Sequence, residues 1–311
     1  MAQQDSVALN HFPRVVWRNS EKRLWNPIHR KALKNRPEER VRLRIIEYLI
    51  RGGWSKHRIS TEEAINLPQK EAALRTDLIC YTQAFDPFLL IECKAENIKL
   101  SEKTATQIAR YNQRVEAPFL FMTNGQIDYW YALSKKQSVR RLDQIPEFFP
   151  DRSKPQTDFD YWKDRGFAGK RAVPALRSWL KEVLHKNLMQ ADASSLRFLS
   201  FSTQLADIDL NHYYHIYRFD EHRLAFGFLA TEFGGSRIIT ILNRKGHNEA
   251  VLEINLDLLF DDRTPNASIY WSGETNNEDA RNFIDGLMEV PFDGSKVAEN
   301  ISSRLKKLVT S

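Results

Sequence analysis

The sequence has very little cysteine and no long apolar run. Of its 311 residues only Cys80 and Cys93 are cysteines, too few for a disulfide framework, which favours a reducing, cytoplasmic location. No stretch of about 18 apolar residues occurs, so we expect no transmembrane helix and no membrane partner. The first residues show no basic segment followed by an apolar stretch, so no signal peptide is expected.

Several motifs that would identify a function class are also missing. No G-x-x-x-x-G-K-[ST] pattern occurs, so no P-loop, no ATP and no ATP-driven motor are expected. A G-x-S-x-G nucleophile elbow and an H-E-x-x-H helix are absent as well, which argues against the common serine hydrolases and zinc proteases.

Positive charge is concentrated in the first half of the chain. Residues 1–150 hold 25 Lys and Arg against 17 Asp and Glu, whereas the remainder holds 21 against 23. This asymmetry indicates an anionic partner for the first half, with DNA the leading candidate, although a solvated basic face would give the same pattern. We expect Arg40, Arg42, Arg44 and Lys56 to contact phosphates.

Patterning predicts an α/β first half. Residues 36–53 predict a helix that starts at Pro37 and ends at the Gly52-Gly53 pair. Residues 75–82 and 86–95 predict two strands joined by a short turn, and residues 101–117 predict the next helix. Asn124-Gly125, between two apolar runs, predicts a tight hairpin.

The second half predicts an α+β domain with an antiparallel sheet. Residues 146–174 are rich in Pro, Asp and Gly, so we place domains at 1–150 and 160–311 on either side. A helix is predicted at 175–191. Strand-like segments follow at 196–203, 212–219, 223–231, 236–243 and 250–260. Two final helices are predicted at 277–290 and 294–309.

The strongly apolar run "LLIECKA" ends in two charges. Strand side chains alternate, so Leu90, Glu92 and Lys94 share one face. Asp77 lies near the start of the preceding strand, and in an antiparallel hairpin that start lies opposite the partner's end. Asp77 and Glu92 can therefore converge on one point. A plain Glu92–Lys94 ion pair at a fraying strand end is the structural alternative.

Two carboxylates and a lysine suit a magnesium site. Mg²⁺ usually takes one or two carboxylates and keeps several waters, so Asp77 and Glu92 are candidate ligands. The ion would lower the pKa of a bound water, and Lys94 could orient that water or steady charge on a phosphate. Gln107 and Tyr111 lie four residues apart, so they share a helix face that could bind the substrate.

The order of these parts resembles the PD-(D/E)xK nuclease superfamily, including the Q-x-x-x-Y element of its RecB-like members. "NPIHRKALKNRPEERVR", "LRTDLICY", "PFLLIECKA", "QIARYN" and "APFLFMTNG" are similar to the N-terminal nuclease domain of type I restriction enzyme R subunits, over roughly residues 24–132. Thr76 stands where the superfamily pattern has Pro. Without a P-loop, the chain resembles a stand-alone form that lacks the ATPase motor.

The resemblance implies a fold and a set of roles. The fold would be restriction-endonuclease-like, a mixed central sheet flanked by helices. Asp77 and Glu92 would be metal ligands, Lys94 the catalytic lysine and Glu39 the acidic residue of the first helix. Gln107 and Tyr111 would form the Q-x-x-x-Y pair.

The sequence thus predicts a Mg²⁺-dependent deoxyribonuclease, with Mn²⁺ as a substitute, acting in restriction, defence or DNA processing. The second domain would target the enzyme, read DNA or support assembly, and a homodimer is left open. The alternative is a DNA-binding or partner-recruiting module that keeps the nuclease fold without cutting.

Overall fold

A computed structural model describes most of the chain, namely residues 4–62, 64–65, 74–134, 139–144, 146, 157–190, 195–201, 208–261, 264, 266–284, 287 and 292–310. The chain divides into two compact units, Met1–Pro155 and Gln156–Ser311. Residues 147–156, near the start of the predicted boundary segment 146–174, lie outside the described residues.

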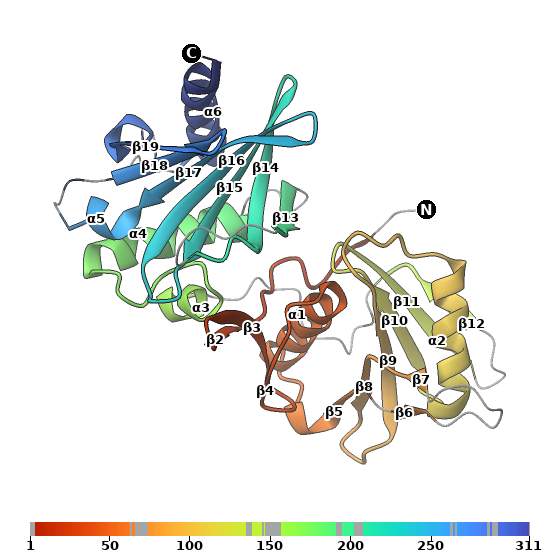
Figure 1. The fold of residues 1–311 in the computed structure, drawn as a ribbon. Coiled ribbons are helices and arrows are strands. Elements are labelled where there is room, and N and C mark those ends of the chain that lie inside the picture. Colours follow the sequence, from red (N-terminus) through yellow and green to blue (C-terminus); the bar gives the residue numbers. More distant parts are fainter. Residues whose placement is uncertain are drawn as a thin grey trace. The chain divides into compact units, whose positions relative to one another are not determined.

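The first unit contains a mixed sheet with the order β1-β11-β10-β9-β8-β5, and β12 also pairs with β11 (Figure 1). Its strands are β1 (Gln4–Asp5), β5 (Ile59–Thr61), β8 (Leu78–Tyr81), β9 (Pro87–Cys93), β10 (Phe119–Thr123), β11 (Ile127–Leu133) and β12 (Val139–Leu142). β9 and β10 run parallel and the other described pairs run antiparallel.

Two helices cover the faces of this sheet. Helix α1 (Pro37–Arg51) packs on the face that carries Leu89, Ile91 and Cys93. Helix α2 (Glu102–Val115) connects the parallel strands β9 and β10 and packs on the opposite face. The predicted alternation along residues 89–93 is therefore confirmed, because successive residues enter different apolar clusters.

The predicted ends and turns of this unit are also observed. Helix α1 begins at Pro37 and ends at Arg51, with Gly52 in the C-cap position, as the sequence indicates. Gly125 closes the hairpin between β10 and β11 with a φ of +76°, which a glycine adopts without steric cost. Ser101 occupies the position before α2, but its side chain makes no capping hydrogen bond.

Some elements of the first unit were not predicted. A separate antiparallel sheet precedes α1, with strands β2 (Val15–Arg18), β3 (Glu21–Asn26) and β4 (Lys31–Leu33). These strands are rich in charged and half-buried residues, so the apolar pattern that identifies a strand is weak. A 3-10 helix, Lys56–Arg58, and the short pair β6 (Ala64–Ile65) and β7 (Leu74–Arg75) complete the unit.

The second unit is built on an antiparallel sheet in which each strand pairs with the next along the chain. Its strands are β13 (Leu196–Leu199), β14 (His212–Phe219), β15 (His222–Ala230), β16 (Ser236–Arg244), β17 (His247–Asn255), β18 (Asn266–Trp271) and β19 (Glu274–Asp279). The predicted antiparallel sheet is confirmed.

Helices of this unit pack mainly on one face of the sheet, as Figure 1 shows for α4 and α6. Trp179 of α4 contacts Phe228, and Gly294, at the start of α6, lies near Tyr217. The opposite face carries an apolar cluster that includes Ala225 and Ile241. The helices are α3 (Phe159–Asp164), α4 (Pro174–Leu184), a π-helical continuation (His185–Gln190), α5 (Leu256–Leu259) and α6 (Gly294–Thr310).

One predicted helix is wrong, and one predicted strand is too long, because Leu256–Leu259 of the predicted strand 250–260 form helix α5. Residues 277–290 were expected to be helical, but Glu274–Asp279 form strand β19 and Ala280–Asn282 form a single 3-10 turn. The strand pairs along its whole length with β18, which was not predicted either. Cross-strand hydrogen bonds stabilise "ETNNED" here against its low strand propensity. Residues 285–286 and 288–290 lie outside the described residues.

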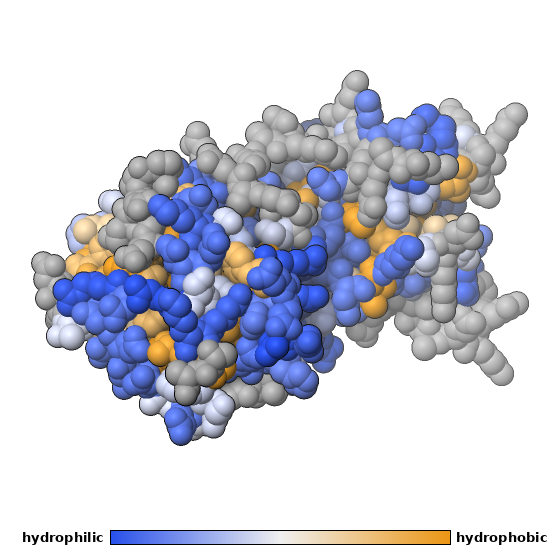
Figure 2. Space-filling model, turned by 90° about the horizontal axis from the view of Figure 1, so that it is seen from above, coloured by the Kyte–Doolittle hydropathy of each residue, from blue (hydrophilic) through white to orange (hydrophobic). Residues whose placement is uncertain are grey.

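Hydrophilic residues cover most of the coloured surface on the face drawn in Figure 2, with smaller apolar areas between them. Large apolar side chains that are exposed include Phe85, Ile98, Val139 and Phe233. Within the described residues no helix is both long and apolar enough to cross a membrane.

Candidate functional site

Strands β8 and β9 bring Asp77 and Glu92 together. The antiparallel register pairs Leu78 with Ile91, so one further step along both strands places Asp77 beside Glu92. The backbone N–H of Cys93 donates a hydrogen bond to Asp77 Oδ2 at 2.7 Å, which fixes this carboxylate at the end of β9. Two carboxylates from different strands thus meet at one edge of the hairpin.

Lys94 connects this pair to helix α2. Its Nζ donates hydrogen bonds to Glu92 Oε1 at 2.6 Å and to Gln107 Oε1 at 3.2 Å. Gln107 Nε2 in turn donates to the Tyr111 hydroxyl at 2.8 Å. The crossover from β9 to β10 lays α2 over this face, so the helix residues predicted to share a face point at the lysine.

Helix α1 adds an acid and an arginine. Glu39 Oε2 accepts a hydrogen bond from Arg42, and the same guanidinium lies 3.4 Å from Glu62 Oε1 and 3.5 Å from Asp77 Oδ1. Arg42 therefore joins Glu39 to Asp77. We name these seven residues the carboxylate site, namely Glu39, Arg42, Asp77, Glu92, Lys94, Gln107 and Tyr111.

The three arginines near the start of helix α1 do not have the exposed positions that the sequence predicted. Arg40, Arg42 and Arg44 were expected to contact phosphates, but all three are buried, and Arg44 is only 2% exposed. Arg44 donates to the carbonyl oxygens of Ala8, Leu9 and His11 and pairs with Glu96 at 2.7 Å. Arg42 follows Glu39 by three residues, a spacing that indicates a same-face ion pair on a helix.

Burial and neighbouring charges raise the pKa values of Asp77 and Glu92. Burial, followed by the charge of Asp77, raises the pKa of Glu92 to about 7. Burial also raises the pKa of Asp77, although the Cys93 N–H and the charge of Arg42 oppose this change. For both groups burial is the largest cause, because taking a carboxylate out of water disfavours its charged form.

Lys94 stays a cation. Burial lowers its pKa, but the hydrogen bond and the charge of Glu92 raise it by more, so the net pKa is raised. The pKa of Arg42 is likewise raised, because its carboxylate partners outweigh the effect of burial. At neutral pH both groups supply fixed positive charge at the edges of the site.

The donor set fits a hard divalent cation. The site holds more carboxylates than cations, and Glu39 Oε1 is buried with no hydrogen-bond partner among the described residues. Within those residues, no three or more His, Cys, Asp and Glu side chains are grouped to hold a metal ion. Asp77 and Glu92 are the two carboxylates that could hold such an ion, and Mg²⁺ commonly uses one or two carboxylates together with waters.

Comparison with known protein families gives a match for part of the chain. Residues 37–146 match the family described as type I restriction enzyme R protein N terminus (HSDR_N). The match begins at α1, whereas the resemblance in the sequence was placed from about residue 24. It contains all residues of the carboxylate site. No curated protein and no solved structure matches the chain.

Proposed function

We propose that this chain is a Mg²⁺-dependent DNA nuclease, because residues 37–146 match the N-terminal family of type I restriction enzyme R proteins. The observation that supports this proposal most directly is that Asp77, Glu92 and Lys94 lie together at one end of the β8–β9 hairpin. Restriction-related action on DNA agrees with the family match. Hydrolysis of the phosphodiester bond and the need for the metal are the parts that we propose.

Asp77 and Glu92 would hold the ion. When bound, Mg²⁺ would supply a water of lowered pKa and polarise a phosphate oxygen. Glu92 is almost fully buried, with 4% of its side chain exposed, while the Asp77 side chain is 22% exposed. Asp77 thus faces the side from which DNA can approach, and Glu92 anchors the site from within.

Lys94 would act as a fixed positive charge. Its raised pKa keeps it protonated at neutral pH, so it serves as a hydrogen-bond donor rather than as a free-amine base. Gln107 accepts a hydrogen bond from one N–H group of Lys94 and donates one to the Tyr111 hydroxyl. The hydrogen bonds from Lys94 to Glu92 and Gln107 use two of the three ammonium N–H groups, so the third would be available to stabilise negative charge that develops on the attacked phosphate.

Glu39 and Arg42 would tune the carboxylates. Arg42 contacts Glu39, Glu62 and Asp77, so it offsets part of the repulsion around Asp77. The free buried oxygen of Glu39 gives the site a further acceptor for a metal-bound water. Arg42 is a positioning residue in this account, because it acts on the DNA through Asp77.

We also propose that the first unit has the restriction-endonuclease-like fold. The mixed sheet, the helices on both faces and the placement of the site at strand ends support this assignment. The division at 1–150 and 160–311 then separates a cutting domain from one that targets, reads or assembles. The absence of a P-loop supports action without ATP.

A digestion panel tests the proposal. The full chain is incubated with plasmid, linear duplex, single-stranded and methylated DNA, in Mg²⁺, Mn²⁺ or EDTA. We expect cutting with either metal, none in EDTA, and none by Asp77→Asn. Asp86→Asn, which removes an exposed carboxylate from the other end of the same hairpin, is the matched control and should cut normally. Binding without cutting on every substrate would favour the alternative of a DNA-binding module.

A further inference from the structure

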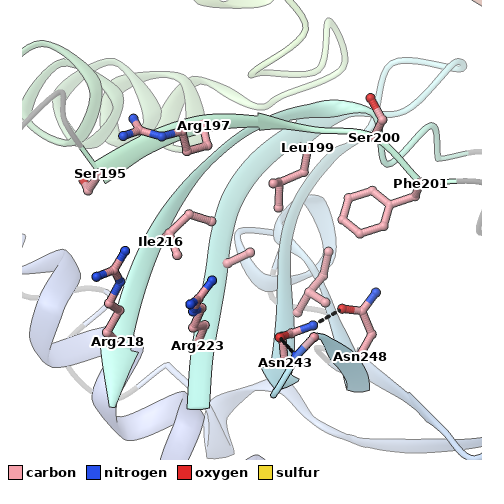
Figure 3. A pocket seen from close by; sticks show the side chains of 13 residues that line it. Ser195, Arg197, Leu199, Ser200, Phe201, Ile216, Arg218, Arg223, Asn243 and Asn248 are labelled. Atoms are coloured by element: carbon pink, nitrogen blue, oxygen red, sulfur yellow. Dashed lines mark hydrogen bonds between the residues drawn. The ribbon is translucent and has the colours of Figure 1, made fainter. Parts of the chain in front are cut away.

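A second candidate site lies in the other unit of the chain. The sheet face that carries Ile216 and Ala225 is hollowed by a cavity of about 790 Å³. We name it the arginine cavity, since Arg197, Arg218 and Arg223 line it (Figure 3). None of these residues belongs to the carboxylate site, and this volume falls in the range of small-ligand pockets, roughly 300–1,000 Å³.

The floor of the cavity is apolar and set by strand register. Ile216 pairs with Ala225 across β14 and β15, and Ala225 pairs with Ile241 across β15 and β16. Residues opposite one another in an antiparallel ladder present their side chains on the same face. Leu199 and Phe201 add an aliphatic and an aromatic wall.

A polar row crosses the same face two residues further along the strands. Arg218 pairs with Arg223, Arg223 with Asn243, and Asn243 with Asn248. Figure 3 shows both arginine side chains rising next to each other from β14 and β15, with the two asparagines beside them. Asn243 donates to Asn248 Oδ1 at 2.8 Å, so this bond uses the oxygen of Asn248 and not its amide N–H groups, and Asn248 lines the cavity.

The paired arginines are an unneutralised charge. Like charges directly opposite each other on neighbouring strands destabilise a sheet. Among the described residues, neither the Arg218 nor the Arg223 guanidinium group makes an ion pair or a hydrogen bond, although the two backbones pair across β14 and β15. The nearby acid Glu221 is paired with Arg244 at 2.7 Å and with Lys245 at 3.2 Å. An anion bound between the two guanidinium groups would remove this cost.

We propose that the arginine cavity binds a nucleoside phosphate. The phosphate would lie on Arg218 and Arg223, because guanidinium groups bind phosphate with paired, charge-assisted hydrogen bonds. The base would lie over the apolar floor against Phe201, and Asn248 would donate to its polar edge. The combination of paired cations, one aromatic ring and amide groups beside an apolar floor favours a nucleotide over a simple anion or an acidic peptide.

Two sources can supply this group: a free nucleotide and a nucleotide within single-stranded DNA. The full chain is titrated in EDTA, which prevents metal-dependent cutting, with four probes in turn: dAMP, inorganic phosphate, a dye-labelled oligothymidylate and polyglutamate. Calorimetry or anisotropy gives the affinity. The double variant Arg218→Ala, Arg223→Ala should weaken the affinity for dAMP at least about tenfold, because each charge-assisted hydrogen bond to the phosphate contributes substantially to binding.

Matched variants separate the specific site from general charge. Arg244→Ala combined with Arg281→Ala removes the same charge from exposed positions of the same unit and should leave the affinity for dAMP unchanged. Phe201→Leu keeps the wall apolar but removes the ring, so it should weaken dAMP and leave inorganic phosphate unchanged. All of these titrations are made in EDTA, so their outcome does not depend on whether the chain cuts DNA.

Each outcome decides the proposal. An oligonucleotide that binds more tightly than dAMP and loses affinity in the arginine double variant identifies single-stranded DNA as the source. Binding of dAMP alone identifies a free nucleotide. Equal binding of dAMP and phosphate, insensitive to Phe201→Leu, would overturn the nucleoside assignment, and so would polyglutamate binding without dAMP binding. A dAMP affinity unaffected by the arginine double variant would overturn the site.

Discussion

Replacing Glu92 by glutamine should stabilise the metal-free protein at alkaline pH. The Glu92 side chain is 4% exposed, and its ionised form is opposed by burial and by the charge of Asp77. Glutamine has nearly the same shape and can still accept the hydrogen bond from Lys94. The substitution therefore removes the unfavourable charge and keeps the packing.

The size of the effect follows from the pKa. The pKa of Glu92 is raised from its ordinary value of 4.5 to about 7, and each unit of difference corresponds to about 1.4 kcal/mol. The folded state binds the proton more tightly than the unfolded state, so wild-type stability falls as pH rises from about 4.5 to about 7. Above that window the ionised side chain costs roughly 3 kcal/mol, which is the gain expected for Glu92→Gln.

Urea unfolding in EDTA, followed by tryptophan fluorescence, measures this difference. At about pH 4.5 wild type and Glu92→Gln should have similar stability, and the variant should become more stable as pH rises. Glu116→Gln, which neutralises an exposed carboxylate of the same unit, is the control and should show no such trend. Added Mg²⁺ should stabilise wild type at alkaline pH but not Glu92→Gln.

Two results would contradict this prediction: a Glu92→Gln variant that is less stable than wild type at about pH 8, or a stability difference that does not change with pH. Either result would mean that the Lys94–Glu92 ion pair outweighs the cost of burying the carboxylate. Glu92 would then be a structural partner of the lysine, the alternative that the sequence left open.

Further outcomes are expected from the same structure. Asp77→Ala should abolish cutting while DNA binding, measured by anisotropy, persists; a variant that cuts at the wild-type rate would remove Asp77 from the metal site. Lys94→Ala should reduce cutting about a hundredfold or more in a plasmid assay, whereas Lys99→Ala, at an exposed position, should not. Arg44→Met should destabilise the chain by about 3–5 kcal/mol in urea unfolding, because it leaves a carboxylate and three carbonyl groups without their partner. Duplex DNA affinity should fall with salt at a log–log slope of about −0.9 per phosphate contacted, and an affinity insensitive to salt would contradict backbone binding.

The part of the site that depends on strand geometry could be predicted from the sequence. Alternation fixes that Glu92 and Lys94 share a face, and the short turn before β9 fixes that Asp77 returns to them. Helical spacing likewise predicts that Gln107 and Tyr111 point the same way. Each of these relations lies within one short segment, either a hairpin or two turns of a helix. The pattern of residues along that segment is therefore sufficient to predict it.

Other features depend on contacts between distant segments. Arg44 is buried because the carbonyl groups of residues 8–11 fold over it, and no pattern in "RVRLRII" shows that partner. For this reason the prediction that Arg44 contacts phosphates is wrong. Strand β19 is polar and reads as a helix, since only its pairing with β18 makes it extended. The arginine cavity was not predicted for the same reason, because its residues come from separate strands brought into register.

The most direct test of the central claim is the single-turnover rate of DNA strand cleavage in Mg²⁺, measured with DNA affinity in the same samples. Wild type, Glu92→Ala and the control Glu116→Ala are compared on the substrate that the digestion panel identifies. We expect Glu92→Ala to bind DNA as tightly as wild type without cutting it, while Glu116→Ala does both. Cleavage by Glu92→Ala at the wild-type rate would contradict the assignment of the carboxylate site as the site of cutting.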